Sequence, residues 1–192
     1  MHNVKGGGDI MIYLVGDILT AGNQLLRAAQ AKILRELGLN IYSPIEDKEI
    51  NDKTKQTRET NDNLAERIVL KDTAAIRKCD TIIAEVDNNS IGSICELAQI
   101  KEMNWFHEQI VDILRKNKDE DLRKKFQNLI KQVPFKTVYC FNDDLRNTNI
   151  DEKGNRRSHY YNQYLHGICL EITEGRGIQK FNQILKYFKK EK

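Results

Sequence analysis

Short apolar runs that alternate with longer amphipathic stretches limit the fold of this chain more than any other feature. The apolar runs predict buried strands at 11–15, 39–43, 81–86, 137–141 and 168–172. Apolar residues recur at helical spacing over 22–37, over 61–78, from Ser93 onward and over 177–190. The alternation favours an α/β fold, with a doubly wound, five-stranded parallel sheet covered by helices on both faces.

Composition narrows the class of protein. The 192 residues are 40% hydrophobic and 31% charged, which is typical of a globular domain. A net charge of +3 does not favour nucleic acid as a partner. No apolar run reaches the roughly 18 residues of a membrane helix, and no secretory signal is visible. The 4 cysteines are widely spaced and the 4 histidines lack ligand spacing, so we expect reduced thiols, a cytoplasmic location and no metal site.

Two segments stand apart from this pattern. Residues 1–10 lack periodicity and precede Met11, where we expect the natural start, so a disordered extension is predicted there. Residues 104–134 form a mixed-charge helical stretch that is longer than a crossover between strands requires. This insertion could be a helical arm, an oligomer surface or a solvated helix with no further role. Residues 11–192 would otherwise form one domain.

Asp72 is the first of two carboxylates that could carry chemistry. It falls between Ile68 and Ile76 at helical spacing, in the middle of an apolar stripe. Burial would raise its pKa and keep it protonated, as a general acid requires. The alternative is an aspartate that caps or bonds a neighbouring loop.

Glu96 is the second carboxylate and lies near the start of the next helix. Ser93-x-x-Glu96 is the pattern of a capping box, which would explain the spacing without any function. In the functional interpretation, the helix start faces the crevice at the carboxyl ends of the strands, where parallel sheets bind ligands. Its free amides would keep Glu96 ionised, as suits a nucleophile. Such carboxyl pairs are typical of glycosidic-bond chemistry with a covalent intermediate.

Other polar residues follow the same strand ends. Gly16 and Asp17 follow the first strand. Asp87 is either a polar strand terminus or a ligand contact, and the loop that ends at Ser90 could cradle a sugar or a phosphate. The phosphate signal is weak because the chain has neither a P-loop nor a G-x-G-x-x-G motif.

Taken in order, these segments resemble the nucleoside 2-deoxyribosyltransferase family. The matching segments cover nearly the whole domain apart from 104–134, and they are Ile12-Tyr13-Leu14-Val15-Gly16, Tyr42-Ser43-Pro44, Asp72 with Ile76 and Asp80, Gly92-Ser93-Ile94-Cys95-Glu96-Leu97, and 143–147 followed by 161–165. The fourth segment is similar to the family's Gly-Thr-x-x-Glu-Leu/Val signature, whose glutamate is the nucleophile.

The resemblance implies a flavodoxin-like sheet, an obligate homo-oligomer with shared active sites, and no metal or organic cofactor. Its substrates would be 2′-deoxynucleosides and free purine or pyrimidine bases. Glu96 would attack C1′, Asp72 would contact the base and transfer a proton, and Tyr13 would help position Glu96. The residues to which we assign substrate binding are Gly16, Asp17, Asp87, Ser90, Gly92, Asn162 and Tyr164. Among them, Asn162 would be lent to a neighbouring subunit.

Ser90 departs from the family pattern, because transferases usually carry an aspartate there for the sugar 5′-hydroxyl. A serine at this position is similar to the related deoxynucleoside 5′-monophosphate N-glycosidases, in which hydroxyls receive a phosphate and water is the acceptor. Asp17 would repel a phosphate dianion, and Asn162 resembles the transferases. Base exchange is therefore favoured over hydrolysis of deoxynucleosides or their monophosphates. A non-catalytic nucleotide sensor is the third hypothesis, because a fold alone does not fix function.

Overall fold

A computed structural model describes residues 11–51, 57–59, 61–145 and 161–189, so the expectation for residues 1–10 lies outside the described residues. The strands are β1 Met11–Val15, β2 Asn40–Tyr42, β3 Thr81–Glu85, β4 Thr137–Phe141 and β5 Ile178–Gln179. The helices are α1 Ala21–Glu36, the 3₁₀ turn η1 Pro44–Glu46, α2 Lys48–Asn51, α3 Leu64–Lys78, α4 Ile91–Lys116, α5 Glu120–Gln132, α6 Gln163–Ile172 and α7 Phe181–Phe188. None of these described helices is long and apolar enough to cross a membrane.

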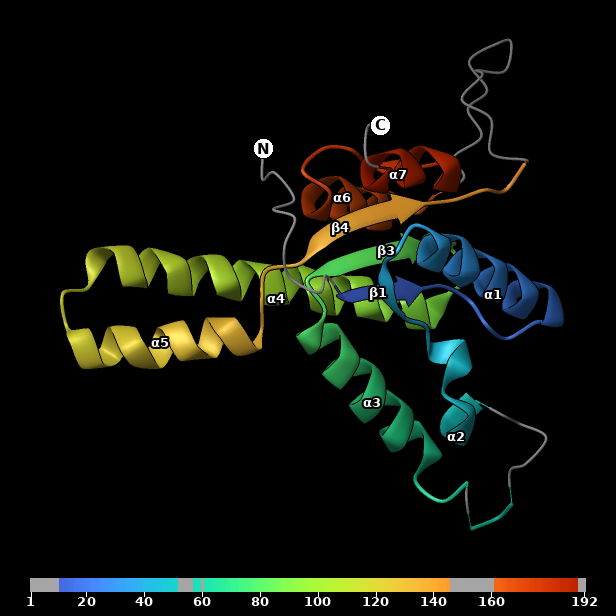
Figure 1. The fold of residues 1–192 in the computed structure, drawn as a ribbon, viewed down its shortest axis with the longest axis horizontal. Coiled ribbons are helices and arrows are strands. Elements are labelled where there is room, and N and C mark those ends of the chain that lie inside the picture. Colours follow the sequence, from blue (N-terminus) through green and yellow to red (C-terminus); the bar gives the residue numbers. More distant parts are fainter. Residues whose placement is uncertain (1–10, 52–56, 60, 146–160, 190–192) are drawn as a thin grey trace.

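The sheet is the doubly wound, flavodoxin-like sheet that the sequence predicts. Its five strands run in the order β2-β1-β3-β4-β5, and every pairing between them is parallel (Figure 1). Helices α3, α4 and α6 pack on one face, and α1 and α7 pack on the other. The strand order reverses between β1 and β3, so a ligand crevice is expected beyond the carboxyl ends of these two strands.

Alternate residues of β1 supply the two halves of the core. Tyr13 and Val15 point to the face covered by α3, α4 and α6, whereas Ile12 and Leu14 point to α1 and α7. Successive side chains of a strand project to opposite faces, so an unbroken apolar run is what a doubly covered strand requires. The Tyr13 side chain therefore lies on the face covered by α3, α4 and α6.

The expected fifth strand at 168–172 is wrong. These residues form the end of α6, and β5 is the two-residue strand Ile178–Gln179. Leu165, Ile168, Cys169 and Ile172 are all buried, at the three- and four-residue spacing of one helix face. The apolar run is therefore the second half of the buried stripe of α6, a helix whose N-cap is Asn162. A short run of this kind does not distinguish a strand from a buried helix segment.

Helix α1 forms where expected, but its buried face is different. Arg27, Gln30, Ala31 and Leu34 are buried, whereas the side chain of Leu25 is 74% exposed. Leu25 belongs to the apolar pattern over 22–37, yet it lies on the exposed side of the helix. The helix instead turns a charged residue into the protein, because Arg27 has an ionic partner there in Glu85.

The 104–134 segment forms the outer half of α4 together with α5, and this hairpin extends beyond the sheet (Figure 1). No residue of α5, all of which the structure describes, is fully buried. The hairpin is fixed at its base, where Asn104 Nδ2 donates to the Lys136 carbonyl at 2.9 Å and the Lys136 amide donates to Asn104 Oδ1 at 2.8 Å. The Lys136 amine donates to the carbonyls of Arg77 and Cys79 at the end of α3, and burial lowers its pKa to about 8.

Candidate active site

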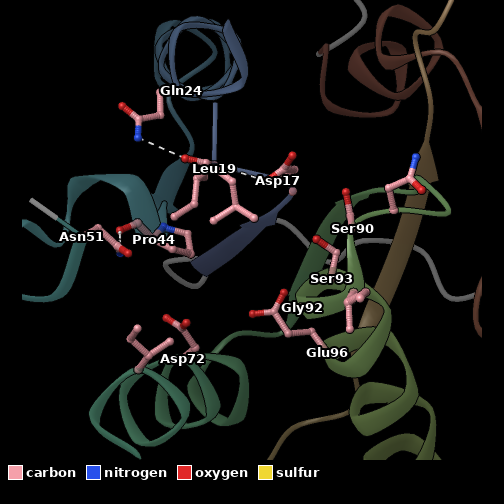
Figure 2. A pocket seen from close by; sticks show the side chains of 15 residues that line it. Asp17, Leu19, Gln24, Pro44, Asn51, Asp72, Ser90, Gly92, Ser93 and Glu96 are labelled. Carbon is pink, nitrogen blue, oxygen red and sulfur yellow. Dashed lines mark hydrogen bonds between the residues drawn. The ribbon is translucent and has the colours of Figure 1, made fainter. Parts of the chain in front are cut away.

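A cleft of about 400 Å³ opens at the carboxyl ends of β1 and β3, where the strand order reverses. Its walls come from the β1–α1 turn, η1 with α2, the middle of α3 and the first turns of α4 (Figure 2). Among the residues expected to bind substrate or to react, those that line it are Gly16, Asp17, Asp72, Ser90, Gly92 and Glu96. Residues from four separate parts of the chain therefore converge on one cleft.

Glu96 and Tyr13 form the central contact of this site. The Tyr13 hydroxyl donates a hydrogen bond of 2.6 Å to Glu96 Oε1, and the Tyr13 side chain is fully buried. Burial raises the pKa of Glu96 to about 7; the bond from Tyr13 opposes this rise, whereas the charge of Asp72 adds to it. Burial and the two carboxyls together hold the pKa of Tyr13 well above its ordinary value, so the phenol remains a donor.

Asp72 lies on the wall opposite Glu96 and projects from α3 into the same cleft (Figure 2). Burial raises its pKa to about 6, and the charge of Asp47 contributes to the rise. Its Oδ1 is buried and has no hydrogen-bond partner among the described residues. Within the described residues this oxygen neither caps a helix nor bonds a loop. The raised pKa means that Asp72 takes up its proton as the pH falls through about 6, well above the range of an ordinary aspartate.

The capping-box interpretation of Ser93-x-x-Glu96 is wrong. Helix α4 begins at Ile91, so the N-cap is Ser90, and Ser93 lies three residues beyond the cap position, inside the first turn. Glu96 instead bonds Tyr13. Ser90 and Ser93 are 8% and 6% exposed, both line the cleft, and in the described chain the Ser90 side chain makes no cap bond to α4. The first turn of α4 therefore offers two hydroxyls and uncapped amides to a ligand.

Asp17 lines the cleft, but its carboxylate is engaged by its own loop. Oδ1 accepts from the Leu19 amide at 2.8 Å, and Oδ2 accepts from Asn23 Nδ2 at 2.6 Å. These bonds fix the turn between β1 and α1. Gly16 at the start of this turn has no room for a side chain, because a Cβ there would lie 2.6 Å from Arg27 Nη1.

Three expected binding residues do not line this cleft within the described chain. Asp87 Oδ1 accepts from the Asn89 amide at 2.7 Å in the loop after β3. Asn162 Oδ1 caps α6 by accepting from the Tyr164 and Leu165 amides, and the Tyr164 side chain is 79% exposed. Asn162 and Tyr164 line a second cleft of about 600 Å³, which lies between α4 and α6.

Sequence reasoning assigned no site role to several residues that shape the site. Ile68 and Asn51 line the cleft beside Asp72, and Gln24 lines it from α1. Tyr42 stacks on Tyr13, and Arg27 lies behind Gly16. Tyr42 could have been found from its position at the end of a strand that pairs with β1. Arg27 carried no signal, because a single arginine in an amphipathic helix is normally solvated.

Glu96→Gln is expected to stabilise the protein in alkaline buffer. The ordinary pKa of glutamate is 4.5, and in the folded protein burial raises that of Glu96 to about 7. A raised folded pKa gives stability that is fully present below the unfolded value and is lost as pH rises through the folded value. The melting temperature of Glu96→Gln should therefore exceed that of the wild type in alkaline buffer, and the gap should close in acid.

Glu102→Gln is the matched control, because Glu102 lies on the same helix with its side chain 61% exposed. Its effect on the melting temperature should be small at every pH. An equal gap for Glu96→Gln in acid and alkali would contradict the burial-driven rise in pKa.

Comparison with known proteins shows similarity at the level of structure. No family model matches the sequence, and no curated protein matches it. A conserved protein from Enterococcus faecalis V583 is 17% identical, with a TM-score of 0.60 over 94% of this chain and 98% of the other. A 2-deoxyribosyltransferase from Bacillus psychrosaccharolyticus is 14% identical, with a TM-score of 0.47 over 91% of this chain and 89% of the other. At these identities the similarity concerns the fold.

Proposed function

We propose that this protein is a nucleoside 2-deoxyribosyltransferase that exchanges the base of 2′-deoxynucleosides in nucleotide salvage in the cytoplasm. The observation that carries the proposal is the pair of carboxyls in one cleft, with Glu96 bonded to Tyr13 at 2.6 Å and Asp72 unbonded at Oδ1 on the facing wall. A nucleophile and a proton donor on opposite walls suit cleavage of a glycosidic bond between them.

In the first half-reaction, a Glu96 carboxylate oxygen attacks C1′. The C1′–N bond breaks, its electron pair passes to the base nitrogen, and the Asp72 proton goes to the base. In the second half-reaction, a nitrogen of the incoming base attacks C1′ and displaces Glu96, and the proton released by that base returns to Asp72. Two inversions at C1′ restore the original configuration. The bond from Tyr13 favours ionised Glu96, which is the form that attacks.

The test is to incubate the purified protein with deoxyinosine in the presence and absence of free adenine. Deoxyadenosine and hypoxanthine should form together, and only when adenine is present. A chromatographic separation of the products gives the answer directly. Free hypoxanthine released at the same rate without adenine would contradict exchange as the main reaction.

Hydrolysis of deoxynucleosides or their 5′-monophosphates is the second candidate, and the first turn of α4 favours it. The hydroxyls of Ser90 and Ser93 and the uncapped end of α4 form a suitable anion site. Both carboxylate oxygens of Asp17 already accept hydrogen bonds from its own loop. Asp17 therefore repels a bound phosphate less strongly than a carboxylate without such partners would. Release of base from deoxyinosine monophosphate without any acceptor would favour this candidate. Tight binding without turnover would favour a sensor.

We also propose that the active form is a homo-oligomer with shared sites. Asn162 and Tyr164 lie in the second cleft rather than beside Glu96, so a substrate contact made by either residue would be to a site in a neighbouring subunit. Mixing inactive Glu96→Ala protein with an Asn162→Ala variant should then restore activity. Some sites of the mixed oligomer would combine an intact Glu96 from one subunit with an intact Asn162 from the other. A monomeric mass in solution would contradict shared sites.

A further inference from the structure

Tyr42 lies beside the phenol that bonds Glu96. It is the last residue of β2, and parallel pairing of β1 with β2 sets Tyr13 opposite Tyr42. The two rings are nearly parallel, with an interplanar angle of 13° and centroids 5.3 Å apart. Both side chains pack into the core on the α3 and α4 face of the sheet. A stacked pair of this kind is attractive beyond the area it buries.

The Tyr13 ring is held from both sides by its neighbours in the sheet. On the β3 side its partner in register is Ile82, which is fully buried. On the β2 side its partner is Tyr42, which is only half-buried and forms the outer boundary of this cluster. Removing the Tyr42 ring would therefore open one side of Tyr13 and leave the other side packed.

The hydrogen bond to Glu96 depends on where the Tyr13 ring points. The phenol oxygen sits at the far end of a rigid ring, so a small rotation at the base of the side chain moves the donor by a large fraction of the bond length. Hydrogen bonds weaken steeply as their angle departs from linear. The bond of 2.6 Å to a carboxylate is charge-assisted when Glu96 is ionised and is therefore sensitive to this loss of alignment.

We propose that Tyr42 is a positioning residue, whose ring holds the phenol of Tyr13 in line with Glu96. This inference rests on the proposed function, since it concerns how the nucleophile is kept ionised. The aromatic ring of Tyr42 provides this positioning, and the hydroxyl of Tyr42 is not required for it. Burial raises the pKa of Tyr42 to about 12, with the charges of Asp72 and Asp47 adding to the rise, so its hydroxyl carries no charge near neutral pH.

The experiment compares Tyr42→Leu with Tyr42→Phe. Phenylalanine keeps the stacked ring, so kcat should stay within about twofold of the wild type, whereas leucine should lower kcat by about tenfold. Tyr42→Leu should also shift the acid limb of the kcat–pH profile to higher pH, because the bond that favours ionised Glu96 is weakened. Asp72 and Tyr13 are the other titratable groups that act on Glu96, and neither is altered.

Tyr13→Phe supplies the second half of the test. In that background the hydroxyl is absent, so adding Tyr42→Leu should cause no further loss of kcat and no further shift of the acid limb. A merely structural role for Tyr42 would give the same additional loss in both backgrounds. That result, or equal kcat values and acid limbs for Tyr42→Leu and Tyr42→Phe, would overturn the proposal.

Failure of the proposed function would look different. If the wild type exchanges no base, carbon-13 NMR of glutamate-labelled protein still follows the titration of Glu96, assigned by its loss in Glu96→Gln. Tyr42→Leu should then raise the Glu96 pKa and Tyr42→Phe should not. An unchanged titration in Tyr42→Leu would overturn the positioning role whether or not the protein is a transferase.

Discussion

Replacing Glu96 with alanine is expected to lower the proposed base exchange by roughly 10³-fold or more, because the proposed mechanism loses its nucleophile. The carboxylate is the group that Tyr13 bonds at 2.6 Å, and it lies on the cleft wall opposite Asp72. Alanine leaves no atom that can form a bond to C1′. Steady-state assays of deoxyadenosine formation measure the loss, and circular dichroism checks that the variant is folded.

The covalent intermediate gives a sharper test of the same role. A substrate analogue that forms a slowly hydrolysed ester should release its base, add the mass of its sugar moiety to the wild type, and place this label on the peptide that contains Glu96. Glu102→Ala is the matched control, since its side chain is 61% exposed on the same helix and it should retain both activity and labelling. Labelling of Glu96→Ala, or full activity of that variant, would rule out Glu96 as the nucleophile.

Arg27→Leu is expected to destabilise the fold by about 3–5 kcal/mol, the usual cost of leaving one partner of a buried ion pair without the other. Arg27 is 1% exposed, its Nη2 lies 2.7 Å from Glu85 Oε1, and its guanidinium lies over the Phe141 ring. Burial raises the pKa of Glu85, and the charge of Arg27 opposes this rise. Without the arginine, Glu85 must be buried unpaired or take up a proton. Urea unfolding followed by circular dichroism measures the change in the free energy of unfolding.

Arg35→Leu is the matched control on the same helix. Arg35 lies 2.6 Å from Glu46, but the two side chains are 42% and 47% exposed, so its loss should cost no more than about 1 kcal/mol. Replacing Arg27 and Glu85 together with leucine should recover much of the stability, because no unpaired charge is then buried. Equal costs for Arg27→Leu and Arg35→Leu would show that burial does not govern the Arg27 pair.

The strands at the centre of the sheet were predictable because their signal is local. Residues 11–15 and 137–141 are apolar runs, and the structure has β1 and β4 with those bounds. β5 was not predictable, because Ile178–Gln179 is too short to carry a pattern and is held by pairing with Cys140 and Phe141. The pattern over 168–172 predicts a strand, whereas these residues are the end of α6, because a short apolar run fits either element.

The sequence by itself determined the order of elements as far as β4 and the position of two carboxyls at the carboxyl edge of a parallel sheet. The helical spacing of Asp72 within an apolar stripe and the position of Glu96 near a helix start are local properties of the chain. Only the tertiary structure decided that Tyr13 bonds Glu96 across 83 residues and that Tyr42 stacks on Tyr13. It also decided that Arg27 turns inward to Glu85. The physical reason is that a local pattern fixes which face of an element is apolar, whereas the partner of a buried polar group depends on segments that folding brings together.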